Sequence, residues 1–220
     1  MILYEDNHIL VAVKPQNMPS QADGSGDPDF LNLLKNYVKE KYNKPGDAYL
    51  GLVHRLDRPT GGVMVFARTS KAASRLSSQI KEHKMLKQYA AVVSANLPSS
   101  ADLEDYIKKD TRTNISSVVW PGEEGAKLAM LHYDVVRRAN GFSLLHVGLR
   151  TGRSHQIRVQ LANVGAPLVG DVKYGGQKCE KLCLWAYKLA FEHPVLKERM
   201  EFCAPYPEYA PWNLFQKVQL

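Results

Sequence analysis

The sequence predicts an α+β fold in which a central sheet, mixed or mostly antiparallel, is flanked by helices. Segments of strand-like composition outnumber helical ones, and several follow one another directly, as in consecutive hairpins. A doubly wound fold would instead alternate strands and helices along the chain. No repeat, low-complexity tract or linker is evident, so one compact domain over residues 1–220 is expected.

The first elements are expected to be a strand, a helix and two more strands. The apolar run at residues 8–14 is typical of a buried strand, and Asp27-Pro28 is a favourable start for a helix. The runs 50–53 and 63–68 are apolar enough for interior strands. The apolar positions that predict the helix are Phe30, Leu33, Leu34, Tyr37 and Val38.

The middle of the chain predicts a second helix and a fourth strand. Thr69 is a good N-cap for a helix with apolar residues Ala72, Ala73, Leu76 and Ile80. Residues 88–95 follow as a strand. Residues 97–113 are polar and are expected to form an excursion on the surface.

The last third predicts a run of strands and one more helix. Strands are expected at residues 115–120, 128–138 and 142–149, with a tight turn at Gly141. A helix over 153–163 would place Ile157, Leu161 and Val164 on one face, and Gly165 would follow its end. Strands at 182–192 and 201–204 complete the prediction.

Composition narrows the class of protein. Apolar residues make up 45% and charged residues 23%, which is ordinary for a globular domain, but the net charge of +7 favours a polyanionic partner. The first residues lack a signal-peptide pattern and no apolar run is long enough for a membrane span, so a cytoplasmic protein is expected. The three cysteines are expected to be free thiols, with no metal site.

One loop contains an acidic residue between two arginines, and an apolar segment lies on each side of the loop. It reads HRLDRPTGG over residues 54–62, with Asp57 between Arg55 and Arg58. A nearby arginine would lower the pKa of the carboxyl group and keep it available as a base or nucleophile. The alternative is an Asp–Arg ion pair that only pins the turn.

Two other segments could carry chemistry. The segment TGRSHQIR, residues 151–158, resembles a helix start that would bind an anion, with His155 and Arg158 on one helix face. Alternatively, these are solvated charges. Tyr89 could stack on a base, or it could simply belong to the core. The sequence has no Walker A loop, dinucleotide fingerprint or zinc-protease motif.

Together these segments resemble the RluA-type family of pseudouridine synthases over nearly the whole chain. The similar motifs are the opening ILYEDNHILV with Lys14-Pro15, HRLD at 54–57, the strand around Lys87, Tyr89 and Val92, and TGRSHQIR. Gly170-Asp171 and Tyr174-Gly175 follow as in that family. The resemblance implies the family's catalytic fold with an active-site cleft. The chain begins too close to the first strand to leave room for the family's N-terminal RNA-binding domain.

The resemblance also implies a role for individual residues. Asp57 would be the nucleophile, Arg158 would pair with it and hold it ionised, and Tyr89 would stack on the target uracil. Arg55 would enter the RNA stack when the uridine leaves it, and Leu184 would wall the pocket. Target selection would use the basic surface, with candidates Lys71, Arg75, Lys81, Lys84, Lys108, Lys109 and Arg112.

The implied reaction is the isomerisation of uridine in ribosomal or transfer RNA, without a nucleotide or other cofactor, by a monomer that does not use a membrane. Two departures from the family pattern, Gly61 and Trp185, remove no proposed catalytic group. Two alternatives are an RNA-binding or RNA-folding module without catalysis and a glycosidase that releases the base. Free uracil would identify the latter.

Overall fold

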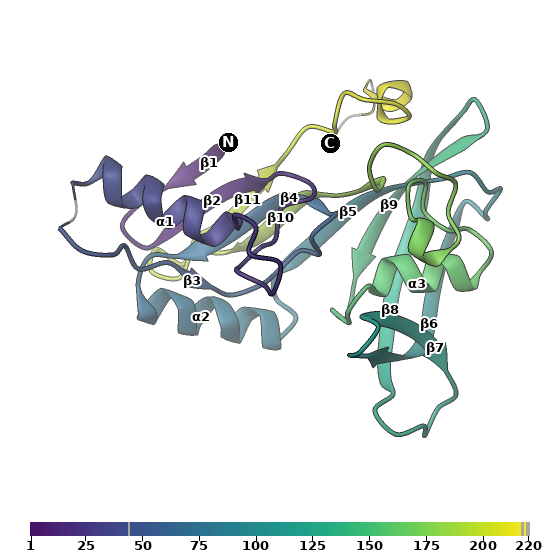
Figure 1. Cartoon of the computed structure of the whole chain (residues 1–220), viewed down its shortest axis with the longest axis horizontal. Helices are drawn as coiled ribbons and strands as arrows, with labels where there is room; N and C mark the ends of the chain where they lie inside the picture. Colours follow the sequence, from purple (N-terminus) through teal and green to yellow (C-terminus); the bar gives the residue numbers. More distant parts are fainter. Residues whose placement is uncertain (44, 217, 219–220) are drawn as a thin grey trace. The chain divides into compact units, whose positions relative to one another are not determined.

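The computed structural model describes residues 1–43, 45–216 and 218. The chain forms two compact units: residues 1–86 with 188–204, and residues 87–187 with 205–220. The boundaries fall within strands β5 (Leu86–Val93) and β10 (Leu184–Glu192). The elements of each unit are labelled in Figure 1. No helix among the described residues is long and apolar enough to cross a membrane.

The first unit contains strands in the order β1-β2-β4-β10, with β3 paired to β4 and β11 to β10. Their bounds are Ile2–Glu5 (β1), Ile9–Lys14 (β2), Gly51–Leu52 (β3), Gly61–Ala67 (β4) and Arg199–Cys203 (β11). The pairs β1–β2, β2–β4, β3–β4 and β10–β11 are antiparallel. Every residue of β4 is buried, as its apolar sequence predicts.

Two helices belong to this unit, α1 (Phe30–Lys41) and α2 (Ser70–Lys81). Helix α1 packs on β4 through Phe30 and Phe66, whose ring centroids are 5.7 Å apart. Its cap is Asp29, which accepts a hydrogen bond from the Asn32 amide, so the helix begins just after the expected Asp27-Pro28 start. The Thr69 cap of α2 is confirmed, since its hydroxyl accepts from the Ala72 amide.

The second unit contains strands in the order β10-β5-β9-β8-β6-β7. Their bounds are Ser100–Asp110 (β6), Ile115–Val119 (β7), Lys127–Ala139 (β8) and Phe142–Leu149 (β9). The pairs β5–β9, β9–β8, β8–β6 and β6–β7 are antiparallel. Asn140 and Gly141, with φ of 49° and 79°, form the β8–β9 turn that Gly141 predicts.

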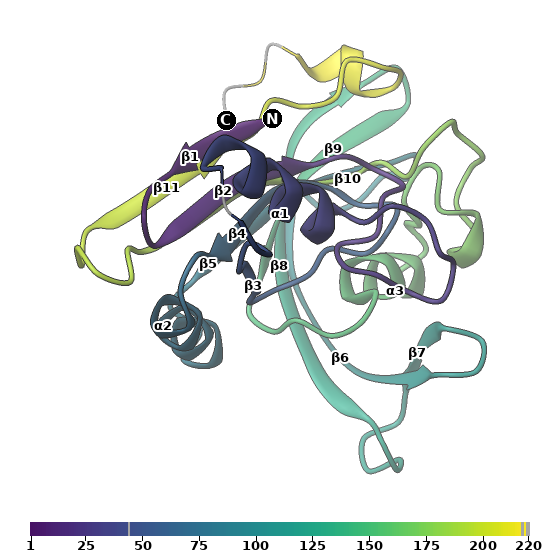
Figure 2. The same ribbon diagram turned by 60° about the vertical axis from the view of Figure 1, so that its left-hand side comes forward.

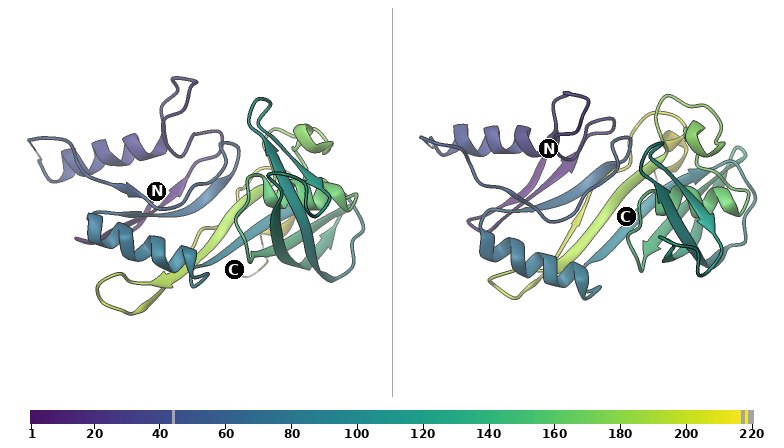
Figure 3. Two further views of the ribbon diagram at one scale, coloured as in Figure 1. Left: turned by 90° about the horizontal axis from the view of Figure 1, so that it is seen from below. Right: turned by 60° about the horizontal axis from the view of Figure 1, so that its bottom comes forward.

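Helix α3 (Gln156–Asn163) packs against β6 and β7, as both views in Figure 3 show. Val159 of α3 joins Ile107 of β6 and Ala129 of β8 in a small buried cluster. Two 3-10 turns, η1 (Val172–Tyr174) and η2 (Trp212–Phe215), follow later in the chain. The α+β prediction with a mostly antiparallel sheet is confirmed. The single domain over residues 1–220 stays a prediction.

Three expected elements need correction. Residues 97–113 are not a surface excursion, because β6 pairs with both β7 and β8 and alternates exposed and half-buried residues along its first half. Residues 50–53 give only the two-residue, half-buried β3. Helix α3 begins at Gln156, because His155 before it has the left-handed φ of 54°, and Val164 is 42% exposed.

Candidate active site

The Asp57 loop connects β3 to β4 and is closed by a tight turn. The Thr60 amide donates to the Asp57 carbonyl at 2.9 Å, and Asp57 itself is half-buried. Two residues later Gly62 has a φ of 125°, which side-chain-bearing residues rarely adopt. Gly62, the second residue of β4, therefore has a backbone conformation that favours glycine.

One buried hydroxyl group, that of Ser20, forms hydrogen bonds with both backbone polar groups of Leu56, the residue before Asp57. Ser20 Oγ donates to the Leu56 carbonyl at 2.8 Å and accepts from the Leu56 amide at 3.1 Å. Two residues after the acid, the side-chain Nε2 of Gln16 donates to the Pro59 carbonyl at 3.1 Å. Residues 15–20, which follow β2, thus hold the loop in place on both sides of Asp57.

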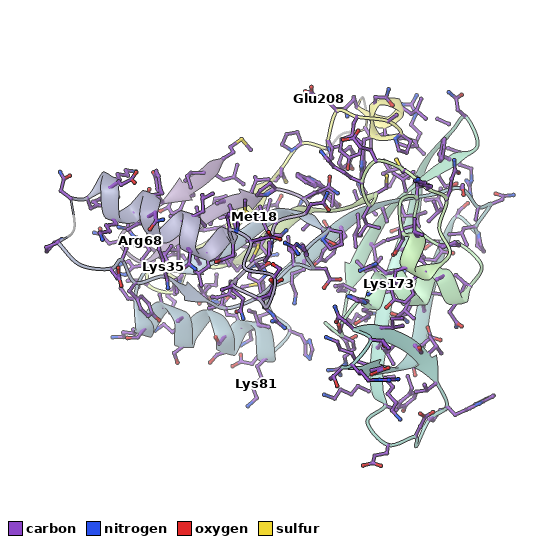
Figure 4. The ribbon with its side chains drawn as sticks, viewed as in Figure 1. Met18, Lys35, Arg68, Lys81, Lys173 and Glu208 are labelled. Atoms are coloured by element: carbon purple, nitrogen blue, oxygen red, sulfur yellow. The ribbon has the colours of Figure 1, made fainter. Side chains whose placement is uncertain are left out.

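Lys14, at the end of β2, places its side-chain nitrogen against this loop. Its side chain is fully buried, and Nζ donates to the carbonyls of Pro15 (2.9 Å), Met18 (2.6 Å) and Arg58 (3.2 Å). Met18 is labelled in Figure 4. Burial lowers the pKa of Lys14 from 10.5 to about 7, while the negative charge of Asp57 acts in the opposite direction.

The two arginines beside Asp57 differ in their surroundings. Arg55 is exposed, as a residue that inserts into RNA would need to be. Arg58 instead forms an ion pair with Asp27 and also donates to the Asn17 carbonyl at 3.4 Å. The loop is further held by His54, whose Nε2 accepts from the Val65 amide of β4 at 3.1 Å.

In the second unit, Arg158 of α3 forms a buried, bidentate ion pair. Its Nε and Nη2 donate to the two carboxylate oxygens of Asp171, each at 2.7 Å. The guanidinium also lies 5.0 Å from the centre of the Tyr174 ring. Arg158 is 6% exposed, so the alternative of a solvated charge is wrong for this residue. The same is true of His155, which is 8% exposed.

Tyr174 connects this pair to the start of α3. Its hydroxyl accepts from the Ser116 amide at 2.9 Å and lies 2.7 Å from His155 Nδ1. Burial raises the pKa of Tyr174, so the hydroxyl keeps its proton and can donate it to His155. The left-handed backbone of His155 and the position of Arg158 are therefore supported by one tyrosine.

The remaining predicted site residues lie on neighbouring strands of the same unit. Tyr89, on β5, is 8% exposed and opposes Val147 of β9. Leu184, the first residue of β10, is 4% exposed, and Trp185 after it is also buried. Asp57 and Arg55 thus belong to the first unit, while Tyr89, Arg158 and Leu184 belong to the second. Their catalytic roles, including the pairing of Arg158 with Asp57, stay predictions.

Sequence reasoning placed Lys14 and Asp171 in segments similar to the family but missed the contacts by which they support the site. Lys14 ends an apolar strand, but a terminal lysine normally reaches solvent, so nothing signals its burial. Asp171 follows Arg158 by 13 residues, a spacing that no local rule connects. Ser20 carries no signal at all. Among the described residues, no group of three His, Cys, Asp or Glu side chains could hold a metal ion.

Comparison with known proteins decides the family. The family model described as RNA pseudouridylate synthase matches residues 8–163, which include β2, the Asp57 loop, β5 and α3. This chain belongs to that family. It is therefore an RNA pseudouridine synthase, an isomerase that converts uridine to pseudouridine in RNA.

Curated bacterial proteins are similar to this chain in sequence, and a solved structure is similar to it in fold. "Ribosomal large subunit pseudouridine synthase D" of Pseudomonas aeruginosa is 34% identical over 97% of this chain and 70% of its own length. The protein of that name from Yersinia pestis is 33% identical over 94% of this chain and 67% of its own length. The fold matches human RNA pseudouridylate synthase domain containing 4 with a TM-score of 0.78, at 24% identity over 94% of this chain and 88% of that one.

Proposed function

We propose that this enzyme isomerises uridine in large-subunit ribosomal RNA and that Asp57 is its nucleophile. The family match supports the reaction, and the names of the bacterial relatives support the ribosomal substrate. The observation that carries the assignment of Asp57 is its backbone: hydrogen bonds from Ser20 and Gln16 fix the residues on both sides of this acid. Such fastening suits a group that must be held in a productive geometry.

The chemistry requires one bond to be exchanged for another. The N-glycosidic bond between uracil N1 and the ribose carbon breaks, the ring turns, and uracil C5 bonds to the same carbon. C5 loses its hydrogen to solvent as a proton, and N1 gains one, so atoms and electrons balance without an oxidant. Asp57 could attack the sugar carbon, promote elimination to a glycal, or add to the uracil ring.

The other predicted residues would assist this exchange. The target base must leave its stack to reach a carboxylate, which costs a few kcal/mol, and Arg55 would occupy the space left in the RNA. Tyr89 would stack on the flipped uracil and Leu184 would wall its pocket. Arg158, already oriented by Asp171, would supply positive charge to Asp57. We further propose one catalytic domain over residues 1–220 that acts as a monomer in the cytoplasm.

Tritium release tests both the reaction and the substrate. RNA labelled with tritium at uridine C5 is prepared from a strain that lacks the gene, and ribosomal and transfer RNA are separated. We expect the wild-type enzyme to release tritium from the ribosomal pool and Asp57→Ala to release none. Release from transfer RNA alone would contradict the ribosomal substrate. RNA binding with no release from either pool would favour the non-catalytic module.

A further inference from the structure

The tip of the β6–β7 hairpin carries exposed cations beside the Arg158 network. Lys109 and Arg112 belong to the hairpin, Arg153 to the turn before α3, and Lys173 to η1, and all four are exposed. Together these four residues are called the hairpin patch. Figure 2 shows the short β7 beside the end of β6, and Figure 4 labels Lys173.

The one acid at this tip is turned toward its own backbone. Asp110 accepts hydrogen bonds from the Arg112 amide (2.8 Å) and from the Thr113 hydroxyl (2.8 Å). These hydrogen bonds lower the pKa of Asp110, so it stays an anion that closes the turn. Within the described ranges, none of the four cations of the hairpin patch forms an ion pair. The patch therefore presents net positive charge to solvent.

Hydrogen bonds connect the hairpin to the residues around Arg158. Ser116 Oγ of β7 donates to the Ser154 carbonyl at 2.8 Å, and the Ser116 amide donates to the Tyr174 hydroxyl. Lys173 Nζ donates to the Asn114 carbonyl at 3.2 Å. Hydrogen bonds thus connect the hairpin to the segments that surround the Arg158–Asp171 pair. An anion bound at the hairpin patch would therefore lie near the motif that contains Arg158.

Several other basic residues that the sequence offers for RNA binding are already engaged. Lys84 pairs with Glu82, Lys108 pairs with Glu123, and the half-buried Arg75 donates to the Pro194 carbonyl. In the hairpin patch, Arg153 and Lys173 also donate to carbonyls, of Leu128 and Asn114, but both side chains are exposed and neither has a carboxylate partner among the described residues. Of the seven basic residues predicted to select the target, Lys109 and Arg112 are the two that combine exposure with proximity to the Arg158 network.

We infer that the hairpin patch binds the phosphate backbone of RNA beside the target uridine. This inference rests on the proposed function and adds to it the place where the substrate is held. Lysine and arginine match the charge of phosphate, and such contacts fix the position of the RNA without reading its sequence. The patch would therefore bind an unrelated RNA as well as the substrate, while the base pocket supplies selectivity.

The salt dependence of binding tests this inference. The triple variant Lys109→Gln, Arg112→Gln, Lys173→Gln is compared with wild type on a ribosomal RNA fragment and on an unrelated transcript of equal length. Each phosphate contact contributes about 0.7 to 0.9 to the slope of log K against log salt. We expect the triple variant to lower the slope by about 2 to 3 for both RNAs.

Two further variants separate the loss of the hairpin patch from a general loss of charge and from the loss of the Lys173–Asn114 hydrogen bond. Lys39→Gln, Lys197→Gln, Arg199→Gln removes the same charge from exposed positions of the first unit and is expected to change the slope by less than about 1. Lys109→Gln, Arg112→Gln keeps the Lys173–Asn114 hydrogen bond and should still lower the slope by about 1.4 to 1.8. An unchanged slope for the triple variant, or an equal loss in the control, would overturn the inference. Tritium release by wild type is scored separately, so failure of the proposed function is recognised independently.

Discussion

The buried pair between Arg158 and Asp171 gives a prediction whose size follows from the structure. In Asp171→Asn the guanidinium keeps its buried position but loses a carboxylate that contacts it twice at 2.7 Å. The side chains of the pair are 7% and 1% exposed, so water cannot replace the lost charge. Removing one partner of a buried pair costs about 3 to 5 kcal/mol.

An exposed pair in the same unit provides the control. Lys108 and Glu123 lie 2.9 Å apart, but their side chains are 43% and 42% exposed. Glu123→Gln should therefore cost at most about 1 kcal/mol. The two substitutions are chemically equivalent, since each turns a carboxylate into an amide, and they differ chiefly in burial.

Urea unfolding at pH 7 measures both effects, together with a double-mutant cycle. Asp171→Asn should lower the free energy of unfolding by about 3 kcal/mol or more, which for a protein of this size lowers Tm by roughly 10 °C. Adding Arg158→Met should cost less than the sum of the single changes, because the two side chains contact each other and each single change disrupts the same buried pair. A loss below about 1 kcal/mol for Asp171→Asn would mean that the buried pair contributes no more than an exposed one.

Two further predictions concern the Asp57 loop. In Lys14→Met, the pH dependence of stability should weaken. Burial lowers the pKa of Lys14 from 10.5 to about 7, so between these pH values the unfolded chain binds more protons than the folded one. Relative to the variant, the free energy of unfolding of wild type should therefore rise by about 2 to 3 kcal/mol from pH 7 to 9, as measured by urea unfolding. An equal pH dependence in both proteins would contradict this. Ser20→Ala leaves the Leu56 amide and carbonyl without their hydroxyl, which should cost about 1 to 3 kcal/mol and slow tritium release roughly tenfold, whereas exposed Ser74→Ala should change neither.

Local sequence signals predicted most of the fold. Thr69 marked the start of α2, Gly141 marked the β8–β9 turn, and apolar runs marked β2 and β4. The sequence did not predict strand β6, because most of its residues are polar. The strand is stabilised by pairing with β7 and β8, and the first half of β6 pairs with β8, which is distant in sequence. His155 similarly takes a left-handed backbone that no local sequence signal predicts, and its ring lies within hydrogen-bond distance of Tyr174.

The candidate site was predicted from motifs, while its support was not. Asp57, Tyr89 and Arg158 stand in motifs similar to those of the family, and those motifs lie within the region that the family model matches. The burial of Lys14 and the pairing of Arg158 with Asp171 depend on tertiary contacts between segments that no sequence period relates. Contacts of this kind become visible only once the chain is folded.

A comparison of two substitutions that each remove one negative charge tests the catalytic role of Asp57. Asp57→Asn and Asp47→Asn remove the same charge from the same unit, but Asp47 is exposed and outside the HRLD motif. With enzyme in excess over tritiated ribosomal RNA, Asp47→Asn should release tritium at the wild-type rate. Asp57→Asn should release none while it still binds the RNA. Release by Asp57→Asn at a rate near that of wild type would contradict the assignment of the nucleophile.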